Sequence, residues 1–365
     1  MRRGLAVLAV GLALAGLLVW LRPGRQTNHT VMTNPPRPRP PSATPEEPPP
    51  GFVRRQLPPP PLLRDGGAGR IAVVLRAGWG RGAGQLGRRG DPASVTEGPM
   101  SFLAGAGGLV ILDNVNQRLV RLDGAGRPLP PIALPNGAAQ DVARGAGDHV
   151  AVLDRLRAGK VTLFDGDGRG LGSVALAGPG IAEPAAVSGI FGDRDGHIIA
   201  ENAHASWIDL VDAAGNAVKT RAHAPGRPTR DGGFVAAAIV NRAAGSIVVH
   251  RFAADGSLKW DAVVLFNAPL LDIALVDADA TGNVFLGAHT ARESTTPPHA
   301  LVDETLHVAQ IVDSEAGGRI LPDQLSVAAP PPREEAFRDL SVGDDGTIYW
   351  MRRTPEGVVI EAYRL

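Results

Sequence analysis

One pattern repeats six times in this sequence, and that repeat constrains the fold more than any other feature. Each copy contains three apolar segments of about six residues, separated by a glycine-containing turn and a polar turn. The clearest copy, residues 98–127, reads GPMSFLAGAGGLVILDNVNQRLVRLDGAGR. Within the segments apolar and polar residues partly alternate, which is the period of β-strands. The sequence therefore predicts an all-β domain built from repeated strand units.

The length of the repeat indicates how these units are arranged. The later copies begin at Ala139, Ala186, Gly226, Leu270 and Phe337. In the first five copies a fourth segment follows, and four of these copies are about 40 to 50 residues long, while an insertion lengthens the fifth. A repeat of that length with four strands is typical of the blades of a β-propeller. A single four-stranded sheet cannot bury both of its faces, so neighbouring blades must cover one another.

The two ends of the repeat region predict how the ring closes. The sixth copy ends at Leu365 without a fourth segment, and an additional apolar segment, residues 71–80, precedes the first copy. We expect this segment to pair with residues 358–363 and to supply the outer strand of the last blade, because closure leaves no unpaired edge. The predicted fold is therefore a six-bladed β-propeller closed by an N-terminal strand. The expected inner strand of the fourth copy, residues 226–232, contains little that is apolar.

The first copy, with the residues that precede it, resembles an NHL repeat. The stretch AGWGRGAGQLG leads into a proline, an inner strand and a D-x-x-N-x-R-[IVL] turn, here Asp113, Asn116, Arg118 and Leu119. The resemblance covers residues 71–365 as an architecture and is close only in the first copy, since later copies lose the Asn–Arg pair. It implies a bacterial six-bladed propeller. Propellers of this kind are mostly binding platforms, with lyases and lactonases among their relatives.

Composition excludes several classes of protein. The 37 basic and 37 acidic residues give a net charge of zero, so nothing indicates a nucleic-acid partner. The sequence contains no cysteine, which excludes disulfides, thiolate metal sites and cysteine nucleophiles. Only 4% of the residues are aromatic, so we expect a core of Val, Leu, Ile and Ala. The Gly-x-Ser-x-Gly and His-Glu-x-x-His motifs are absent from the sequence.

The first 68 residues predict two segments outside the propeller. Residues 4–21 are an uncharged apolar run, and this 18-residue length is enough to span a bilayer. Residues 1–25 are therefore expected to be a hydrophobic helix that acts as a signal anchor in the bacterial inner membrane. Residues 26–68 are expected to be a disordered linker, because 13 prolines between positions 35 and 61 prevent helix and sheet. The propeller, residues 69–365, would then lie in the periplasm. Cleavage after Ala15 and secretion stay open as the alternative.

One residue of each copy is expected at the start of its innermost strand, at one mouth of the central channel. These residues are Ser101, Asp141, Gly189, Gly226, Asp272 and Asp339. Three converging carboxylates suit a hard cation such as Ca²⁺, so the three aspartates are candidate metal ligands. In the alternative interpretation each aspartate accepts backbone N–H bonds and has a structural role. Lactonases that resemble this architecture carry Glu, Asn and Asp ligands in the channel, and asparagine is absent from the equivalent positions here.

The insertion in the fifth copy, residues 289–305, is the other candidate functional feature. It lies between the second and third segments, and alternating strand direction places it at the same mouth as the aspartates. Long loops in compact folds often carry function. The candidate ligand or partner contacts of this loop are His289, Arg292, Glu293 and His299. His289 is also a candidate general base.

Taken together, these features predict a membrane-tethered, non-catalytic binding or scaffold module for a protein or glycan partner, with no cofactor unless Ca²⁺ binds. The alternative is a Ca²⁺-dependent hydrolase or lyase, similar to a lactonase, with its site at the channel mouth. The sequence does not indicate the identity of the partner.

Overall fold

The computed structural model describes residues 64–65, 69–90, 96–105, 107–135, 137–314, 316–328 and 336–365. The chain divides into two compact units, Met1–Arg55 and Gln56–Leu365, and every described residue belongs to the second. The predicted signal anchor and nearly all of the predicted linker therefore lie outside the described residues. Within the described part of the chain, no helix is both long and apolar enough to cross a membrane.

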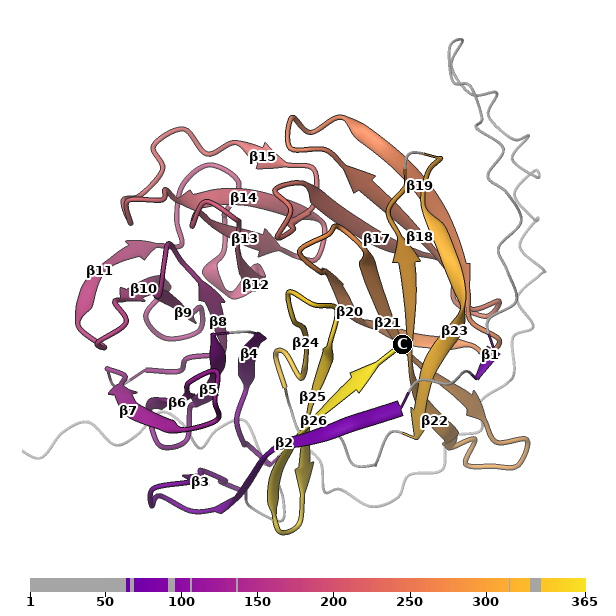
Figure 1. The fold of residues 1–365 in the computed structure, drawn as a ribbon, viewed down its shortest axis with the longest axis horizontal. Coiled ribbons are helices and arrows are strands. Elements are labelled where there is room, and N and C mark those ends of the chain that lie inside the picture. The colour runs from indigo at the N-terminus through magenta and orange to yellow at the C-terminus, as the bar shows by residue number, and fades with distance from the viewer. Residues whose placement is uncertain are drawn as a thin grey trace, which may run out of the picture. The chain divides into compact units, whose positions relative to one another are not determined.

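Six sheets arranged as a ring form the second unit, and each sheet is one blade (Figure 1). Blade 1 contains β4 (Ser101–Gly105), β5 (Gly108–Asp113), β6 (Arg118–Leu122) and β7 (Pro128–Ala133). Blade 2 contains β8 (Asp141–Arg144), β9 (Val150–Asp154), β10 (Lys160–Phe164) and β11 (Gly170–Ala175). A short 3₁₀ helix, η1 (Pro184–Ala186), leads into blade 3, which contains β12 (Val187–Gly192), β13 (Ile198–Asn202), β14 (Ser206–Val211) and β15 (His223–Ala224).

The other three blades follow the same order from the inside of the ring to the outside. Blade 4 contains β16 (Arg227–Pro228), β17 (Phe234–Asn241), β18 (Ser246–Phe252) and β19 (Leu258–Leu265). Blade 5 contains β20 (Leu270–Ala278), β21 (Val284–Glu293), β22 (Leu301–Val312) and β23 (Arg319–Ala328), with β1 (Arg64–Asp65) added in parallel. Blade 6 contains β24 (Leu340–Val342), β25 (Ile348–Thr354), β26 (Gly357–Arg364), β2 (Gly69–Trp79) and β3 (Gln85–Leu86).

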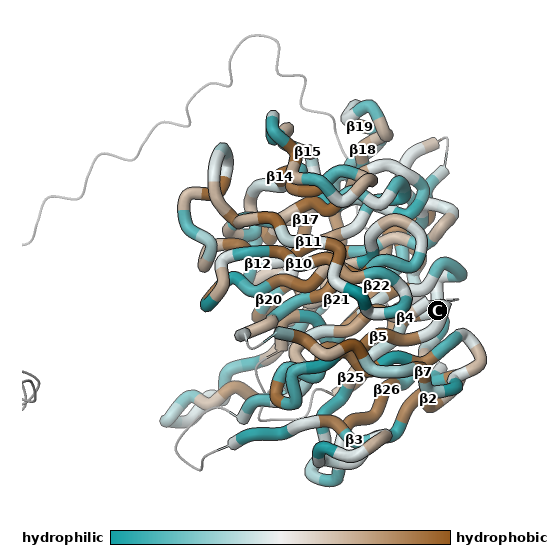
Figure 2. Tube along the Cα trace, turned by 90° about the vertical axis from the view of Figure 1, so that its left-hand side faces the viewer, coloured by the Kyte–Doolittle hydropathy of each residue, from teal (hydrophilic) through white to brown (hydrophobic). Residues whose placement is uncertain are grey.

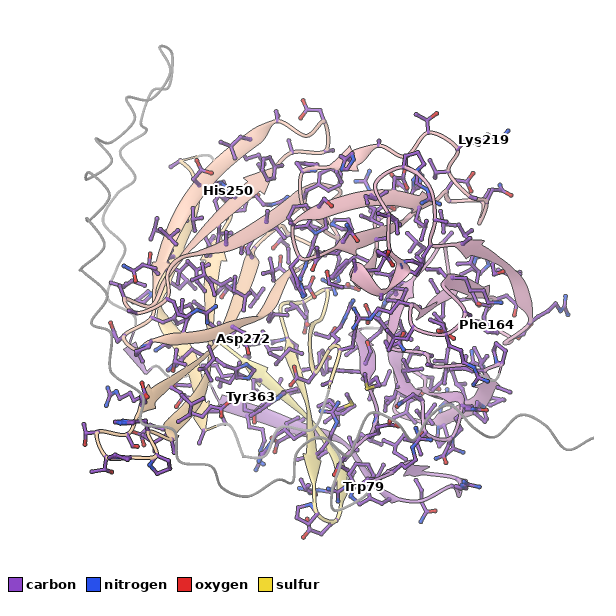
Figure 3. The ribbon with its side chains drawn as sticks, turned by 180° about the vertical axis from the view of Figure 1, so that it is seen from behind. Trp79, Phe164, Lys219, His250, Asp272 and Tyr363 are labelled. Atoms are coloured by element: carbon purple, nitrogen blue, oxygen red, sulfur yellow. The ribbon has the colours of Figure 1, made fainter. Side chains whose placement is uncertain are left out.

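The predicted closure of the ring is confirmed. Strand β2 pairs antiparallel with β26, and the register places Arg70 opposite Tyr363 and Ala77 opposite Val358. In Figure 1 the indigo β2 lies beside the yellow β26, and Figure 3 labels Tyr363 in the same blade. The buried carboxylate of Glu361 accepts hydrogen bonds from Arg70 at 2.8 Å and from Tyr363 at 2.8 Å. The closing strand is therefore held by side chains as well as by its backbone ladder.

The turn that carries the NHL resemblance attaches blade 1 to the closing segment. The Asp113 carboxylate accepts hydrogen bonds from Asn116 Nδ2 at 2.8 Å, from Arg118 Nε at 2.9 Å and from the Gly87 backbone N–H at 2.9 Å. Arg118 in turn donates to the Gln85 carbonyl at 2.7 Å. These residue types therefore have a structural purpose, which is to fix the chain that leads from blade 6 into blade 1.

Apolar side chains between neighbouring blades form the core. The cluster between blades 4 and 5 is built mainly from Val, Ile, Leu and Ala, as the composition predicted. Figure 2 shows apolar segments along the strands and hydrophilic residues in the connecting turns. Each fully buried side chain of this size contributes about 1.5–3 kcal/mol relative to an exposed one, so the mutual covering of blades stabilises the ring.

Blade 4 departs most from the regular pattern. Its inner strand β16 contains two residues, and it ends where Pro228 removes a backbone donor. A side chain at Gly226 is excluded, because its Cβ would lie 2.4 Å from the Val235 carbonyl oxygen. The poor apolar content of residues 226–232 thus corresponds to a short inner strand.

Candidate functional site

A cavity of about 510 Å³ occupies the central channel of the ring. All six innermost strands, β4, β8, β12, β16, β20 and β24, contribute to its lining. The mouth where these strands begin is called the entry mouth below, and the mouth where they end is called the exit mouth. Ser101 and Asp141 are the first residues of β4 and β8, and of the six residues predicted at strand starts Asp141 and Gly189 line the cavity.

Asp141 is buried at the entry mouth, and both of its carboxylate oxygens are engaged by protein. Oδ1 accepts hydrogen bonds from Ser101 Oγ at 2.6 Å and from the backbone N–H of Val142 at 2.9 Å. Oδ2 accepts from the Ile190 backbone N–H at 3.0 Å and from Arg338 Nη2 at 2.8 Å. Asp141 thus joins blades 1, 2, 3 and the segment that enters blade 6. These bonds are of the kind expected in the structural interpretation of the aspartates.

Like Asp141 and Arg338, Glu201 and Arg227 form an ion pair that joins different blades at the entry mouth. Glu201 on β13 is buried and accepts from Arg227 Nε at 2.6 Å and from Trp207 Nε1 at 3.0 Å. Burial opposes ionisation of Glu201, but the charge of Arg227 and the hydrogen bonds outweigh it, so the pKa of Glu201 lies well below its ordinary value. The Arg227 guanidinium lies 4.7 Å from the ring centre of Phe191, as does that of Arg338.

The structure brings Asp272, His289 and Asp339 together between blades 5 and 6. A hydrogen bond of 2.8 Å joins His289 Nδ1 to Asp272 Oδ1, which confirms that the insertion begins beside that aspartate. Figure 3 labels Asp272 on the inner side of blade 5. Burial raises the pKa of the Asp339 carboxyl, and the charges of Arg353 and His289 oppose the rise.

The calcium site proposed for Asp141, Asp272 and Asp339 stays a prediction. Across the described ranges, no group of three or more His, Cys, Asp or Glu side chains is placed to hold a metal ion. Asp141 uses its oxygens for protein donors, whereas Asp272 pairs with His289. Two of the remaining strand-start positions, Gly189 and Gly226, carry no ligand atom in a side chain.

The insertion is a long hairpin, whereas its sequence predicted a loop. Strands β21 and β22 continue into it, with Arg292 opposite Val302 and Glu293 opposite Leu301, so that only residues 294–300 form the turn (Figure 1). Arg292 and Glu293 are exposed. His299 is also exposed, and its Nδ1 lies 3.1 Å from the Ser294 carbonyl oxygen within the turn.

A polar groove of about 310 Å³ lies at the root of this hairpin. It is lined by Asn267, Ala268, Thr290, Arg292, Asp303, Thr305, His307, Gln324 and Ser326. The His307 ring is held in place, since its two nitrogens lie 3.0 Å from Thr290 Oγ1 and 3.2 Å from Ser326 Oγ. Of the predicted contacts only Arg292 lines this groove. Alternating polar positions on β21, β22 and β23 were the signal that sequence reasoning missed.

The exit mouth carries arginines that the sequence analysis did not identify. Arg230 bonds to Asp277 Oδ1 at 2.7 Å and lies 3.1 Å from Asp344 Oδ1. Arg194 pairs with its neighbour Asp195 at 3.6 Å. Arg144 also lines the cavity, and among the described residues its guanidinium has no hydrogen-bond acceptor or ion-pair partner.

The surroundings of Arg144 disfavour its charge. Burial and the nearby charge of Arg230 lower the pKa of Arg144, and the carboxylates of Asp344 and Asp277 only partly oppose this. Asp148 lines the adjoining cleft between blades 1 and 2 but forms no ion pair with Arg144. By contrast, the carboxylates of Asp277 and Asp344 outweigh the burial of Arg230 and raise its pKa.

Comparison with known proteins does not assign this chain to a family. No known protein family matches the sequence, and no curated protein is similar to it at a significant level. Virginiamycin B lyase from Staphylococcus aureus has a TM-score of 0.40 at 12% identity, over 73% of this chain and 94% of that one. The WD40 repeats of RRP9 have a TM-score of 0.43 at 13% identity, over 76% of this chain and 96% of that one. Kuenenia stuttgartiensis hydrazine synthase has a TM-score of 0.42 at 13% identity, over 69% and 72%. Similarities this low do not indicate an activity.

Proposed function

We propose that this protein is a non-catalytic binding module that recognises a glycan in the groove at the root of the β21–β22 hairpin. The observation that carries the proposal is the lining of that groove. Strands β21, β22 and β23 present their polar side chains on one face, and a loop that follows β19 adds Asn267. Eight of the nine lining residues are polar or charged.

The chemistry of this lining suits a neutral polyhydroxylated ligand. Sugar hydroxyls both donate and accept hydrogen bonds, so a matching site needs amides, hydroxyls and an imidazole together. Arg292 and Asp303 contribute opposite charges, so the groove has no net charge to attract an ion. Its volume of about 310 Å³ is at the lower end of the range for small-ligand sites, which suits a short stretch of a glycan chain.

A protein partner is supported less well by the same region. The fully buried core of a protein interface is depleted in charge and rich in aromatic residues. The hairpin exposes only Leu301 and Val302 as large apolar side chains, and the groove beside them is polar. We therefore assign the hairpin to glycan binding.

The proposal includes a location. Residues 1–25 would anchor the chain in the bacterial inner membrane, and the proline-rich linker would extend by about 3 Å per residue into the periplasm. A spacer of this kind suits a module that must reach an extended polymer. Membrane fractionation with N-terminal sequencing tests this part, and a soluble mature protein that begins after Ala15 would replace tethering by secretion.

Calorimetric titration of the detergent-solubilised full chain tests glycan binding. The probes are cellohexaose, maltohexaose and chitohexaose. We expect at least one to bind, and Arg292→Ala to weaken that binding at least tenfold. Glu293→Ala is the matched control, because Glu293 is the next residue of β21 and does not line the groove. Absence of binding to all three, or an equal loss in both variants, would contradict the proposal.

One observation favours an enzyme as the second candidate. The Asp339 carboxyl, with its raised pKa, lies near the hydrogen-bonded His289–Asp272 pair, and an acid beside an imidazole can transfer protons. Hydrolysis of γ-butyrolactone and phenyl acetate by the full chain, with and without millimolar Ca²⁺, tests it. The binding proposal expects no turnover and no change of melting temperature with Ca²⁺. Turnover that His289→Ala abolishes would replace it with a hydrolase.

A further inference from the structure

Among the described arginines that line the channel, one has no carboxylate within ion-pair distance. Five arginines line the cavity: Arg144, Arg194, Arg227, Arg230 and Arg338. Each of the last four has a carboxylate within 4.0 Å, from Asp195, Glu201, Asp277 or Asp141. Arg144 has none among the described residues, although Asp277 and Asp344 line the same cavity.

The Arg144 guanidinium lies against the inner strand of the neighbouring blade. Arg144 is the last residue of β8, and its head group lies against Gly105, the last residue of β4 in the next blade. A Cβ at Gly105 would be 2.5 Å from Arg144 Nη2, so a side chain there would displace the head group. The arginine is exposed to the cavity, and its planar fork of donors is open to a ligand.

We propose that the channel binds a small organic carboxylate, and that Arg144 holds the carboxylate by a bidentate hydrogen-bonded pair. This binding goes beyond glycan recognition and uses a separate cavity. An arginine fork matches the geometry of a carboxylate, and such charge-assisted pairs are the strong hydrogen bonds of proteins. The ligand supplies the direct ion-pair partner that Arg144 lacks among the described residues.

The lining also indicates which class of anion binds and whether the rest of the ligand is polar or apolar. A phosphate carries a charge of about −1.5 to −2 at neutral pH and would be repelled by Asp277 and Asp344. A carboxylate carries a single charge and matches the single unpaired arginine. Phe191 and Ile273 line the cavity and are only partly buried, so the remainder of the ligand is apolar.

The test compares hexanoate with hexanamide, which differ in the charged head group and share the same chain. Binding to the full chain is measured by ligand-observed saturation-transfer NMR, with inorganic phosphate as a competitor. We expect hexanoate to bind at least tenfold more tightly than hexanamide. Phosphate at equal concentration is expected to leave hexanoate bound, and displacement by phosphate would overturn the assignment to a carboxylate.

Three variants locate the site. Arg144→Gln is expected to lower hexanoate affinity at least tenfold, and Arg144→Lys to retain part of it, since lysine keeps the charge and loses the fork. Arg194→Gln is the matched control, because Arg194 lines the same cavity and pairs with Asp195, and it is expected to change affinity less than twofold. Equal binding of hexanoate and hexanamide, or unchanged binding in Arg144→Gln, would overturn the inference. The hexasaccharide titration with Arg144→Gln separates the two proposals, because glycan binding at the hairpin is expected to be unaffected.

Discussion

The two ends of strand β8 lie in the same channel and have opposite roles. Asp141 at its start is completely buried and accepts four hydrogen bonds, from three blades and from Arg338. Arg144, three residues later at its end, is exposed to the cavity and has no described partner. Both are charged residues on an inner strand. What differs is whether a described residue of opposite charge pairs with them directly.

This difference separates residues that build the ring from residues that are free to bind. A buried charge must be paired and hydrogen-bonded, because burial of an isolated charge carries a large penalty. Asp141 meets that condition inside the protein, so it joins blades. Arg144 is exposed to the cavity and does not need a protein partner, so under our proposal it is available to an anion at the exit mouth.

The largest expected effect is that of Asp141→Asn. Both carboxylate oxygens accept from a backbone N–H, Oδ1 from Val142 and Oδ2 from Ile190, so the amide NH₂ of asparagine must oppose one of them in either orientation. The change also leaves Arg338 without its charged partner. We expect a loss of about 3 kcal/mol in the free energy of unfolding, measured with urea on the full chain.

Arg144→Gln is the paired measurement for the same strand. Its side chain has no hydrogen bond to lose among the described residues, so we expect a change within about 0.5 kcal/mol. A large loss of stability in this variant, or a small one in Asp141→Asn, would show that the two ends of β8 do not differ as described.

A smaller effect is expected from Ser101→Ala. The Ser101 hydroxyl is buried and donates to Asp141 Oδ1 at 2.6 Å, and three other donors to the carboxylate remain after its removal. Hydrogen bonds to charged groups contribute about 1.5–3 kcal/mol, so we expect a loss near 1.5 kcal/mol in the same urea experiment. In the double variant with Asp141→Asn the two losses should not add, because Asp141→Asn already weakens the charge-assisted bond that Ser101→Ala removes. Strict additivity would mean that Ser101 stabilises the ring independently of Asp141.

The fold was predictable because its information is local and repeats. Glycine turns, strand periods and the length of each copy gave the blades, and the missing fourth segment at Leu365 predicted the closure by β2. The insertion was mistaken for a loop, since its pairing depends on register, with Arg292 opposite Val302 and Glu293 opposite Leu301. A run of polar residues does not reveal that two strands extend through it.

The site was less predictable because its contacts join distant copies of the repeat. Asp141 and Arg338 are 197 positions apart, and nothing near either residue indicates the other. Counting along each copy singled out Asp272 and Asp339, which both lie near His289, but burial and partners decide which of the aspartates are available. Arg144 follows directly on a short apolar strand, and only the arrangement of six blades shows that it faces a cavity without a carboxylate beside it.

The smallest expected effect concerns the third aspartate of the entry mouth and depends on pH. Burial raises the pKa of Asp339 above its ordinary value of 3.8, so the folded state binds this proton more tightly than the unfolded state. The stability that the protonated carboxyl provides is therefore present below about pH 4 and is lost as the pH rises through the folded-state pKa. The asparagine of Asp339→Asn carries no charge at any pH. The free energy of unfolding of this variant minus that of the wild type should therefore increase from about pH 4 to the folded-state pKa of Asp339 and then level off. Urea unfolding of both proteins at several values between pH 4 and 8 measures this difference. If this free-energy difference instead falls as the pH rises, Arg353 and His289 hold Asp339 ionised. Asp339 would then belong with Asp141 among the aspartates whose charge the protein pairs.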